Sequence, residues 1–275
     1  LDLPGGAHLA ESVTAMRADI VSNTYGITGA GVTVAILDTG IDTTHVDLAD
    51  SIVGQQCFTD ANCQPGNVDQ SSSAQDLNGH GTHVSGIVTG NGEQAPHGFA
   101  TNAKIVAVRV LDQSSSGWVS DWIAGLDWLN ANYATTPVDI VNMSLGTFTL
   151  FPGNCDANQP TMAAAISNLR AKGVVIFASS GNQGSSTTIA APACISGVIA
   201  VGATYDSNVG RQPSSGSYAS FFGSSADCFD ASTALNKITC FTNSNSQVDI
   251  LAPGAPIVST RLGGTSTTYY GTSQA

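Results

Sequence analysis

The sequence predicts an α/β protein built on a doubly wound, mostly parallel β-sheet with helices on both faces. Short runs of β-branched residues alternate with longer helix-like stretches along the 275-residue chain, and such alternation is typical of βαβ units. The strand-like runs, for example 173–178, are apolar on both faces rather than at every second position. Strands that helices cover on both sides have this pattern.

The expected elements follow from this alternation in chain order. Strands are expected near 31–37, 104–110, 138–143, 173–178, 197–202 and 247–251, and helices near 9–23, 80–90, 119–132 and 159–171. The segments rich in Ser, Asn, Gly and Asp are expected to be surface loops: 55–75, 111–117, 179–188 and 206–247. Repeats and composition breaks are absent, so we expect a single domain over residues 1–275.

Composition limits the classes of partner. The chain carries 20 acidic and 8 basic side chains and a net charge of −12, which argues against nucleic acid and anionic membranes as partners. No apolar run is long enough to span a bilayer, and no signal segment follows Leu1. Because the chain begins with Leu1 rather than Met, we expect that an upstream segment has been removed.

Six cysteines form an even set without the Cys-x-x-Cys spacing of zinc sites: Cys57, Cys63, Cys155, Cys194, Cys228 and Cys240. Disulfides in a secreted protein are the natural interpretation, and reduced thiols in a cytosolic enzyme are the alternative. Six cysteines allow fifteen connectivities. Cys57 and Cys63 lie close in sequence, as do Cys228 and Cys240, and each pair encloses a polar loop. Cys155 and Cys194 would then remain as the third pair.

Polar motifs stand where the expected strands end, and in open parallel sheets this edge holds the functional site. Asp38 closes the first strand, Ser144 follows 138–143, and Asn182 lies just past 173–178. A dinucleotide site would place a glycine-rich turn after a strand. Gly29-Ala30-Gly31 comes before one, so that hypothesis is rejected.

Three residue types together indicate nucleophilic catalysis. A serine hydroxyl such as that of Ser273 needs an adjacent base to take its proton, and His80 is the candidate base. Asp38 would fix the tautomer of His80 and stabilise its charged form. Taken alone, each residue has a structural interpretation as a cap or a turn residue. The chain order Asp, His, Ser excludes an α/β-hydrolase, in which the histidine follows the serine.

Acyl transfer also needs donors for the oxyanion that forms on attack. The side chain of Asn182 and the backbone N–H of Ser273 are the expected donors. The alternative is that Asn182 is only a turn residue after Gly181.

Five motifs in the same order resemble those of subtilisin-like serine proteases, the subtilases. The motifs are the aspartate segment 34–42, the histidine segment 76–86, the strand end 142–146, the asparagine segment 180–182 and the serine segment 271–275. In the last of these, Gln274 stands where the family usually has methionine. The resemblance covers nearly the whole chain from about residue 18 onward.

The resemblance implies a secreted serine endopeptidase that forms an acyl-enzyme and needs no cofactor for catalysis. Polypeptides are then the expected substrates, and the enzyme's own propeptide is an expected inhibitor of a monomeric protein. Residues 1–10 are expected to be a remnant of the pro-sequence or an N-terminal extension.

By the same resemblance, an extended peptide pairs with exposed backbone while pockets receive alternate side chains. The implied substrate-binding residues are Ser115, Ser116, Gly117, Ser144, Leu145, Gly146, Ala178, Ser179 and Ser180. The far end of the primary specificity pocket would lie near 190–192. Because these residues are small or apolar, we expect a broad preference for large uncharged residues before the cleaved bond.

The sequence does not assign metal ligands. His80 and His83 have a spacing that could bind zinc, but no third ligand is evident, and His83 is expected to be a structural residue. Asp47 matches a calcium ligand position of some subtilases, so structural calcium is one interpretation. A surface carboxylate at Asp47 is the other, because calcium needs several converging oxygens.

The chain departs from the family pattern because it stops two residues after Ser273, where subtilases continue with a buried helix. The interpretations are a fragment, a cleaved downstream segment or an inactive form. A truncated module that binds extended peptides without cleaving them is therefore the alternative function, and an esterase or lipase is a third. The presence of Asp38, His80, Asn182 and Ser273 together favours the peptidase.

Overall fold

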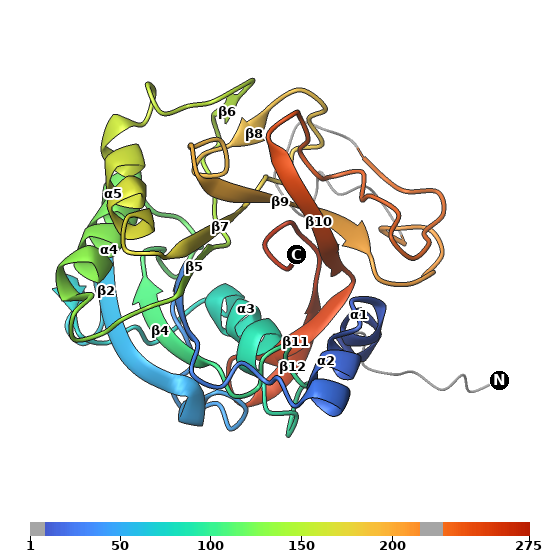
Figure 1. Cartoon of the computed structure of the whole chain (residues 1–275), viewed down its shortest axis with the longest axis horizontal. Helices are drawn as coiled ribbons and strands as arrows, with labels where there is room; N and C mark the ends of the chain where they lie inside the picture. Colours follow the sequence, from blue (N-terminus) through green and yellow to red (C-terminus); the bar gives the residue numbers. More distant parts are fainter. Residues whose placement is uncertain (1–8, 215–227) are drawn as a thin grey trace.

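The computed structural model describes residues 9–214 and 228–275 and confirms the expected doubly wound sheet (Figure 1). Eight strands lie in the order β10-β9-β7-β5-β1-β4-β2-β3. Every neighbouring pair is parallel except β2 and β3. The strands are β1 (Thr33–Asp38), β2 (Ile52–Cys63), β3 (Val68–Ser71), β4 (Lys104–Arg109), β5 (Ile140–Met143), β7 (Val175–Ser179), β9 (Val198–Tyr205) and β10 (Val248–Ala255).

The helices are α1 (Leu9–Ala15), α2 (Ala18–Tyr25), α3 (His80–Thr89), α4 (Val119–Asn132) and α5 (Pro160–Arg170). The expectation of one helix over 9–23 is wrong. Arg17 has a left-handed φ of 59°, which separates α1 from α2, and α2 continues to Tyr25 before Gly26 ends it. Within the described residues, no helix is both long and apolar enough to cross a membrane.

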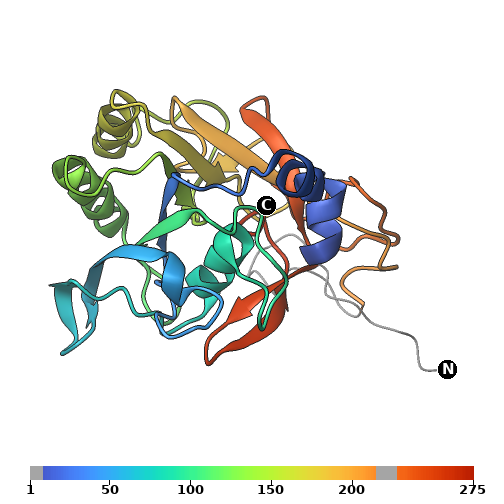
Figure 2. The ribbon, with the colours of Figure 1, turned by 60° about the horizontal axis from the view of Figure 1, so that its bottom comes forward.

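Of the three hydrophobic clusters in the described residues, the two that include β1 lie on opposite faces of the sheet, because alternate side chains of a strand point to opposite faces. On β1, Ala35 and Leu37 pack with α4 and α5, which lie side by side in Figures 1 and 2. Val34 and Ile36 pack instead with Val84 of α3. Burial on both faces explains why the strand sequences are apolar throughout.

Several elements were missed because their sequences are polar or very short. Most of the expected loop 55–75 forms β2 and β3, whose pairing rests on backbone hydrogen bonds. Four further strands and one 3₁₀ turn were also not expected. The strands β11 (Ile257–Arg261) and β12 (Thr265–Tyr269) form a hairpin, and β6 (Leu150–Phe151) and β8 (Ile189–Ala190) are two residues long. The 3₁₀ turn lies at Ala49–Ser51. The expected loop 206–247 falls partly, and the expected N-terminal remnant 1–10 mostly, outside the described residues.

Three disulfides confirm the pairing that the spacing favoured. They join Cys57 to Cys63, Cys155 to Cys194, and Cys228 to Cys240. The second bond joins the loop before α5 to the loop between β8 and β9. It therefore closes a long loop of the chain, which restricts the unfolded state more than the two short bridges do.

His83 attaches α3 to the β11–β12 hairpin, as its expected structural role requires. Its side chain is fully buried, and Nε2 lies 3.2 Å from the carbonyl oxygens of both Ile257 and Thr267. The ring stacks on Tyr269 with 4.4 Å between centroids. Burial, together with the charge of His80, lowers the pKa of His83 to about 3, against the smaller opposing effect of the two hydrogen bonds.

We therefore expect the free energy of unfolding to fall as the pH drops from about 6.5 towards 3. In this window the unfolded chain binds a proton at His83 that the folded chain excludes, so stability falls by up to about 1.4 kcal/mol per pH unit. Urea unfolding at several pH values would measure this slope. It should be shallower in His83→Gln and unchanged in His97→Asn, which alters an exposed histidine. Parallel curves for wild type and H83Q would contradict the assignment.

Candidate active site

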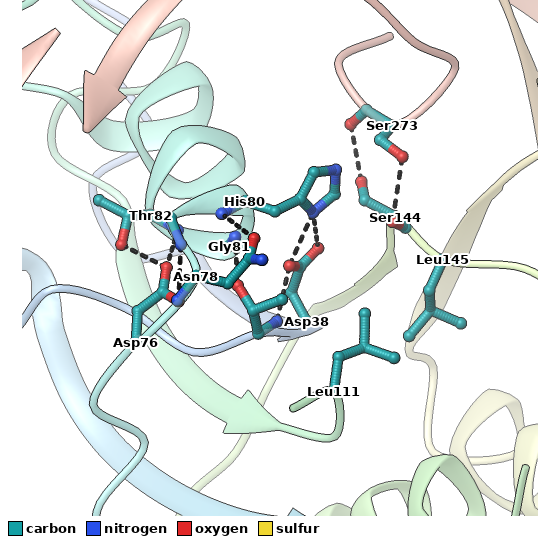
Figure 3. A network of polar contacts seen from close by, with 12 residues as sticks. Asp38, Asp76, Asn78, His80, Gly81, Thr82, Leu111, Ser144, Leu145 and Ser273 are labelled. Carbon is teal, nitrogen blue, oxygen red and sulfur yellow. Dashed lines mark hydrogen bonds and ion pairs between the residues drawn. The ribbon is translucent and has the colours of Figure 1, made fainter. Parts of the chain in front are cut away.

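Asp38 and His80 meet at the carboxyl edge of the sheet. Asp38 is the last residue of β1 and is fully buried, whereas His80 begins α3 with 20% of its side chain exposed. The Nδ1 atom of His80 lies 2.8 and 2.9 Å from the two carboxylate oxygens of Asp38 (Figure 3). This pairing places the proton on Nδ1 and leaves Nε2 as an acceptor.

Backbone contacts hold this pair in position. The N–H of Thr39 donates to Asp38 Oδ1 at 2.6 Å, and the hydroxyl of Thr39 accepts the N–H of Gly81 at 2.8 Å. A Cβ on Gly81 would lie 2.2 Å from the carbonyl oxygen of Gly40, so only glycine fits between His80 and the β1 turn. The requirement for close approach explains the glycine in the His-Gly-Thr motif.

Asp76 fixes the first turn of α3, a role that sequence analysis missed. Its Oδ1 accepts the N–H groups of Asn78 and Gly79, and its Oδ2 accepts the N–H and hydroxyl of Thr82 (Figure 3). A carboxylate that accepts N–H groups at a helix N-terminus is the usual capping arrangement. The signal was an aspartate four residues before an expected helix start.

The electrostatic surroundings favour the charged form of His80. Burial of the ring lowers its pKa, but the charge and hydrogen bond of Asp38, with a smaller contribution from the charge of Asp76, outweigh burial and raise the pKa above its ordinary value of 6.5. A proton arriving at Nε2 is therefore stabilised, which is the property that a general base needs.

Ser273 lies across the same cavity from His80 but does not bond to it. Its hydroxyl donates to the carbonyl oxygen of Ser144 at 3.1 Å, and the hydroxyl of Ser144 donates to the carbonyl oxygen of Ser273 at 2.8 Å (Figure 3). Ser273 stands in a turn, in which the N–H of Gln274 donates to Gly271 at 3.2 Å. Attack would require rotation of the Ser273 hydroxyl away from Ser144 towards His80.

Asn182 is oriented by the residue that precedes the serine. Its Oδ1 accepts both the N–H and the hydroxyl of Thr272, each at 2.9 Å. The hydroxyl of Thr272 in turn accepts the N–H of Gly181 at 3.2 Å. With Oδ1 engaged in this way, the donor end of the amide, Nδ2, is left for another partner, and it lies close to Gly271.

A cavity of about 670 Å³, called the main cleft below, brings most of the expected residues together. It is lined by His80, Ser115, Ser116, Ser144, Leu145, Gly146, Ser179, Asn182 and Ser273. Sequence analysis missed other lining residues, namely Leu111, Thr147, Phe148, Gln183, Tyr269 and Tyr270. Phe148 offered a signal, because an aromatic residue stands between two threonines just after the Ser144-Leu145-Gly146 motif.

Three expected substrate-binding residues do not line the main cleft. Gly117 borders a neighbouring cavity, and Ala178 borders a smaller cavity beneath Ser273. Ser180 is buried, with its hydroxyl donating to the carbonyl oxygen of Asn243 at 2.9 Å. A Cβ on Gly146 would lie 2.9 Å from that of Ala190. These two residues are therefore in close contact and form one wall of the main cleft.

Asp47 is buried and anchors the loop that follows α3. Its Oδ1 accepts the N–H groups of Glu93 and Gln94, at 2.6 and 3.3 Å, and its Oδ2 accepts those of Gln94 and Ala95, at 3.0 and 2.8 Å. Both oxygens therefore face donors, which does not fit a calcium ligand. Across residues 9–214 and 228–275, no group of three or more His, Cys, Asp or Glu side chains could hold a metal ion.

We expect Asp47→Asn to lower the free energy of unfolding by about 1–3 kcal/mol, because three backbone N–H groups, that of buried Ala95 among them, lose a charged acceptor. The loss should be the same in calcium and in a chelator, which thermal unfolding in both buffers would measure. Asp50→Asn, which changes an exposed carboxylate nearby, is the matched control. A calcium-dependent shift present in wild type and absent from D47N would instead identify Asp47 as a ligand.

A doubly wound sheet whose Asp–His pair faces a serine across one cavity, in the chain order Asp, His, Ser, defines the subtilisin-like class. The family model described as "Subtilase family" matches residues 29–275, and the chain belongs to this family.

Comparison with relatives agrees with this assignment. The chain is 34% identical to Subtilisin E of Bacillus subtilis over 257 residues, 92% of this chain and 54% of the relative. It is also 34% identical to a thermophilic serine proteinase of Bacillus sp. strain AK1 over 248 residues, 90% of this chain and 49% of the relative. The chain thus spans about half the length of these two relatives. The crystal structure of a cold adapted subtilisin-like serine proteinase matches with a TM-score of 0.65 and 31% identity, covering 90% of this chain and 72% of that one.

Proposed function

We propose that this chain is the peptidase domain, spanning 1–275, of a secreted serine endopeptidase. The observation that carries the proposal is the Asp38–His80 pair, whose histidine lines one cavity with Ser273 and Asn182. Three disulfides support an oxidising compartment. Catalysis in this proposal needs no cofactor, and the enzyme is monomeric, with its own propeptide as an inhibitor.

The proposed reaction begins when the Ser273 hydroxyl turns from Ser144 to His80 Nε2. Its oxygen bonds to the peptide carbonyl carbon while His80 takes the proton. The oxyanion that forms is stabilised by Asn182 Nδ2 and the backbone N–H of Ser273. The C–N bond then breaks, and His80 returns the proton to the departing amine, which leaves an acyl-enzyme. Water deprotonated by His80 hydrolyses this ester and restores the serine.

Substrate binding in this proposal uses the backbone of 115–117 and 144–146 for an extended peptide. The side chain before the cleaved bond enters between Leu145 and the wall of Gly146 and Ala190. Because this space lacks charged residues among those that line it, large uncharged side chains are preferred there.

Fluorophosphonate labelling followed by mass spectrometry tests the proposal. We expect a single adduct on Ser273 that is absent from Ser273→Ala and from His80→Ala but present in the surface variant Asp127→Asn. Hydrolysis of a casein-like protein should be lost in the same two variants. Peptide affinity without hydrolysis, indifferent to S273A, would instead favour a binding module. Turnover of short esters without proteolysis would favour an esterase.

A further inference from the structure

The hairpin of β11 and β12 is attached to α3, the helix that begins with His80 (Figure 1). Two fully buried hydroxyls of β11, those of Ser259 and Thr260, donate to backbone carbonyl oxygens of α3 at 2.8 and 2.7 Å. A Cβ on Gly86 of α3 would collide with the Thr260 hydroxyl, so the strand approaches the helix as closely as glycine allows. The hairpin therefore has a fixed position relative to the helix that carries the proposed base.

Tyr269, the last residue of β12, lies beside two histidines of α3. Its ring is nearly parallel to that of His83, with 4.4 Å between centroids and 23° between planes. It is also nearly parallel to that of His80, with 6.5 Å between centroids and 17° between planes. Aromatic pairs attract one another at centroid distances of about 4.5–7 Å. Because the histidines are three residues apart, they share one face of the helix, and the Tyr269 ring packs on that face.

His83 is a rigid support for the Tyr269 ring. The two carbonyl oxygens of the hairpin beside its Nε2 atom are acceptors, so Nε2 carries the proton. Its Nδ1 atom has no hydrogen-bond partner among the described residues. With a pKa of about 3, the His83 ring stays neutral while His80 gains and loses its proton. The Tyr269 ring is therefore packed against a group whose charge and position do not change during turnover.

The His80 ring needs such a support, because its hydrogen bonds fix only one of its two nitrogens. Among the described residues, the ring bonds only to Asp38, and only through Nδ1. The second side-chain torsion of histidine has a broad range, so the ring can tilt about this contact and swing Nε2 away from the cleft. Tyr269 and Ser273 line the main cleft together with His80. A flat ring beside the imidazole limits this tilt.

We propose that Tyr269 is a positioning residue that keeps the His80 ring aimed at Ser273. The inference rests on the proposed peptidase function and adds a residue that acts through the base. The Tyr269 ring restrains His80, and His83 restrains Tyr269. Because Tyr269 ends β12 and Ser273 follows four residues later, the hairpin that supports the base also leads directly into the nucleophile segment.

The test compares Tyr269→Leu, which removes the flat ring, with Tyr269→Phe, which keeps it. A small fluorophosphonate reports the reactivity of Ser273 without an extended peptide, so contacts between Tyr269 and a peptide do not affect its labelling rate. We expect this rate to fall about ten- to a hundredfold in Y269L, as for a reacting group displaced by about 1 Å. The turnover number for a peptide should fall by the same factor, and Y269F should retain both rates.

Tyr25→Leu is the matched control, because it makes the same change at a tyrosine that is 70% exposed. It should leave both rates unchanged. A higher KM for peptides in Y269L, with an unchanged labelling rate, would mean that Tyr269 contacts only the substrate, and this result overturns the proposal. An equal loss in Y269L and Y269F overturns it as well, because the hydroxyl rather than the stacked ring would then be responsible.

NMR of the unsubstituted protein decides the question if Y269L does not fold. With ¹³C-labelled tyrosine, and with Y269F used to assign the signal, the ring carbons of Tyr269 should shift as His80 titrates. Because the pKa of His80 is raised above 6.5 and that of His83 is about 3, a midpoint above 6.5 identifies His80 as the source. The shift should be absent from His80→Ala and from the signal of Tyr25. A Tyr269 signal that does not follow His80 overturns the proposal.

The outcomes separate this inference from the proposed function. Labelling of Ser273 in the wild type at a rate that Y269L leaves unchanged overturns the positioning role and leaves the peptidase proposal standing. If the wild type is not labelled and cleaves no peptide, the peptidase proposal fails. The NMR titration then decides on the contact between the rings: a Tyr269 signal that follows His80 supports it, and a signal that does not overturns it.

Discussion

Replacing His80 with alanine is expected to lower the turnover number for peptides about a million-fold while the protein remains folded. The magnitude is that known for the triad histidine of a subtilisin, a relative of this chain. Among the described residues, the partner of the Ser273 hydroxyl is the carbonyl oxygen of Ser144, which cannot carry a proton away. Rates with a peptide substrate, together with circular dichroism, would measure the effect. His97→Ala is the control, since it removes an exposed histidine.

The pH profile tests the same assignment without removing the side chain. Because the pKa of His80 is raised above 6.5, kcat/KM should fall as the pH drops, with a midpoint above 6.5. Asp38→Asn removes the charge that raises this pKa, so the remaining activity, about 10⁴-fold lower, should have its midpoint at lower pH. A flat profile between pH 5 and 8 would show that His80 is not the base.

The sequence predicted well those helices and strands whose residue types are determined by burial in the core. The strands β1, β4, β5 and β7 and the helices α3, α4 and α5 were expected within about two residues of where they lie, because both faces of each strand are covered and apolar. The strands β9 and β10 extend three and four residues past their expected ends. Strands such as β2 and the β11–β12 hairpin escaped prediction, because polar residues pair there through the backbone. The break at Arg17 also gave no signal, since a left-handed arginine has no sequence signature.

The sequence indicated the residues of the candidate site but not the conformation of the Ser273 side chain. Motifs beside the ends of the expected strands indicated Asp38 and Asn182, and the chain order Asp, His, Ser indicated His80. The contact of the Ser273 hydroxyl with Ser144 could not be foreseen, because rotation about one side-chain bond separates it from a contact with His80.

Replacing Asn182 with alanine should lower kcat about 100- to 1,000-fold with little change in KM. An oxyanion donor acts on charge that exists only in the transition state, so its loss leaves substrate binding nearly intact. This range comes from the matching change in a subtilisin. Initial rates over a range of peptide concentrations separate the two constants. A rise in KM at constant kcat would mean that Asn182 binds the substrate and does not stabilise the oxyanion.

Thr272 should act on the same step through Asn182 rather than by itself. Valine at this position keeps the shape of threonine but removes the hydroxyl that donates to Asn182 Oδ1 and accepts from Gly181. The Asn182 side chain then loses one of the two hydrogen bonds that it accepts from Thr272, so its Nδ2 points towards the oxyanion for a smaller fraction of the time. We expect kcat to fall about tenfold in Thr272→Val and much less in Thr272→Ser, which keeps the hydroxyl. In an Asn182→Ala background the same valine change should cost little, because two residues that act through one contact are not additive.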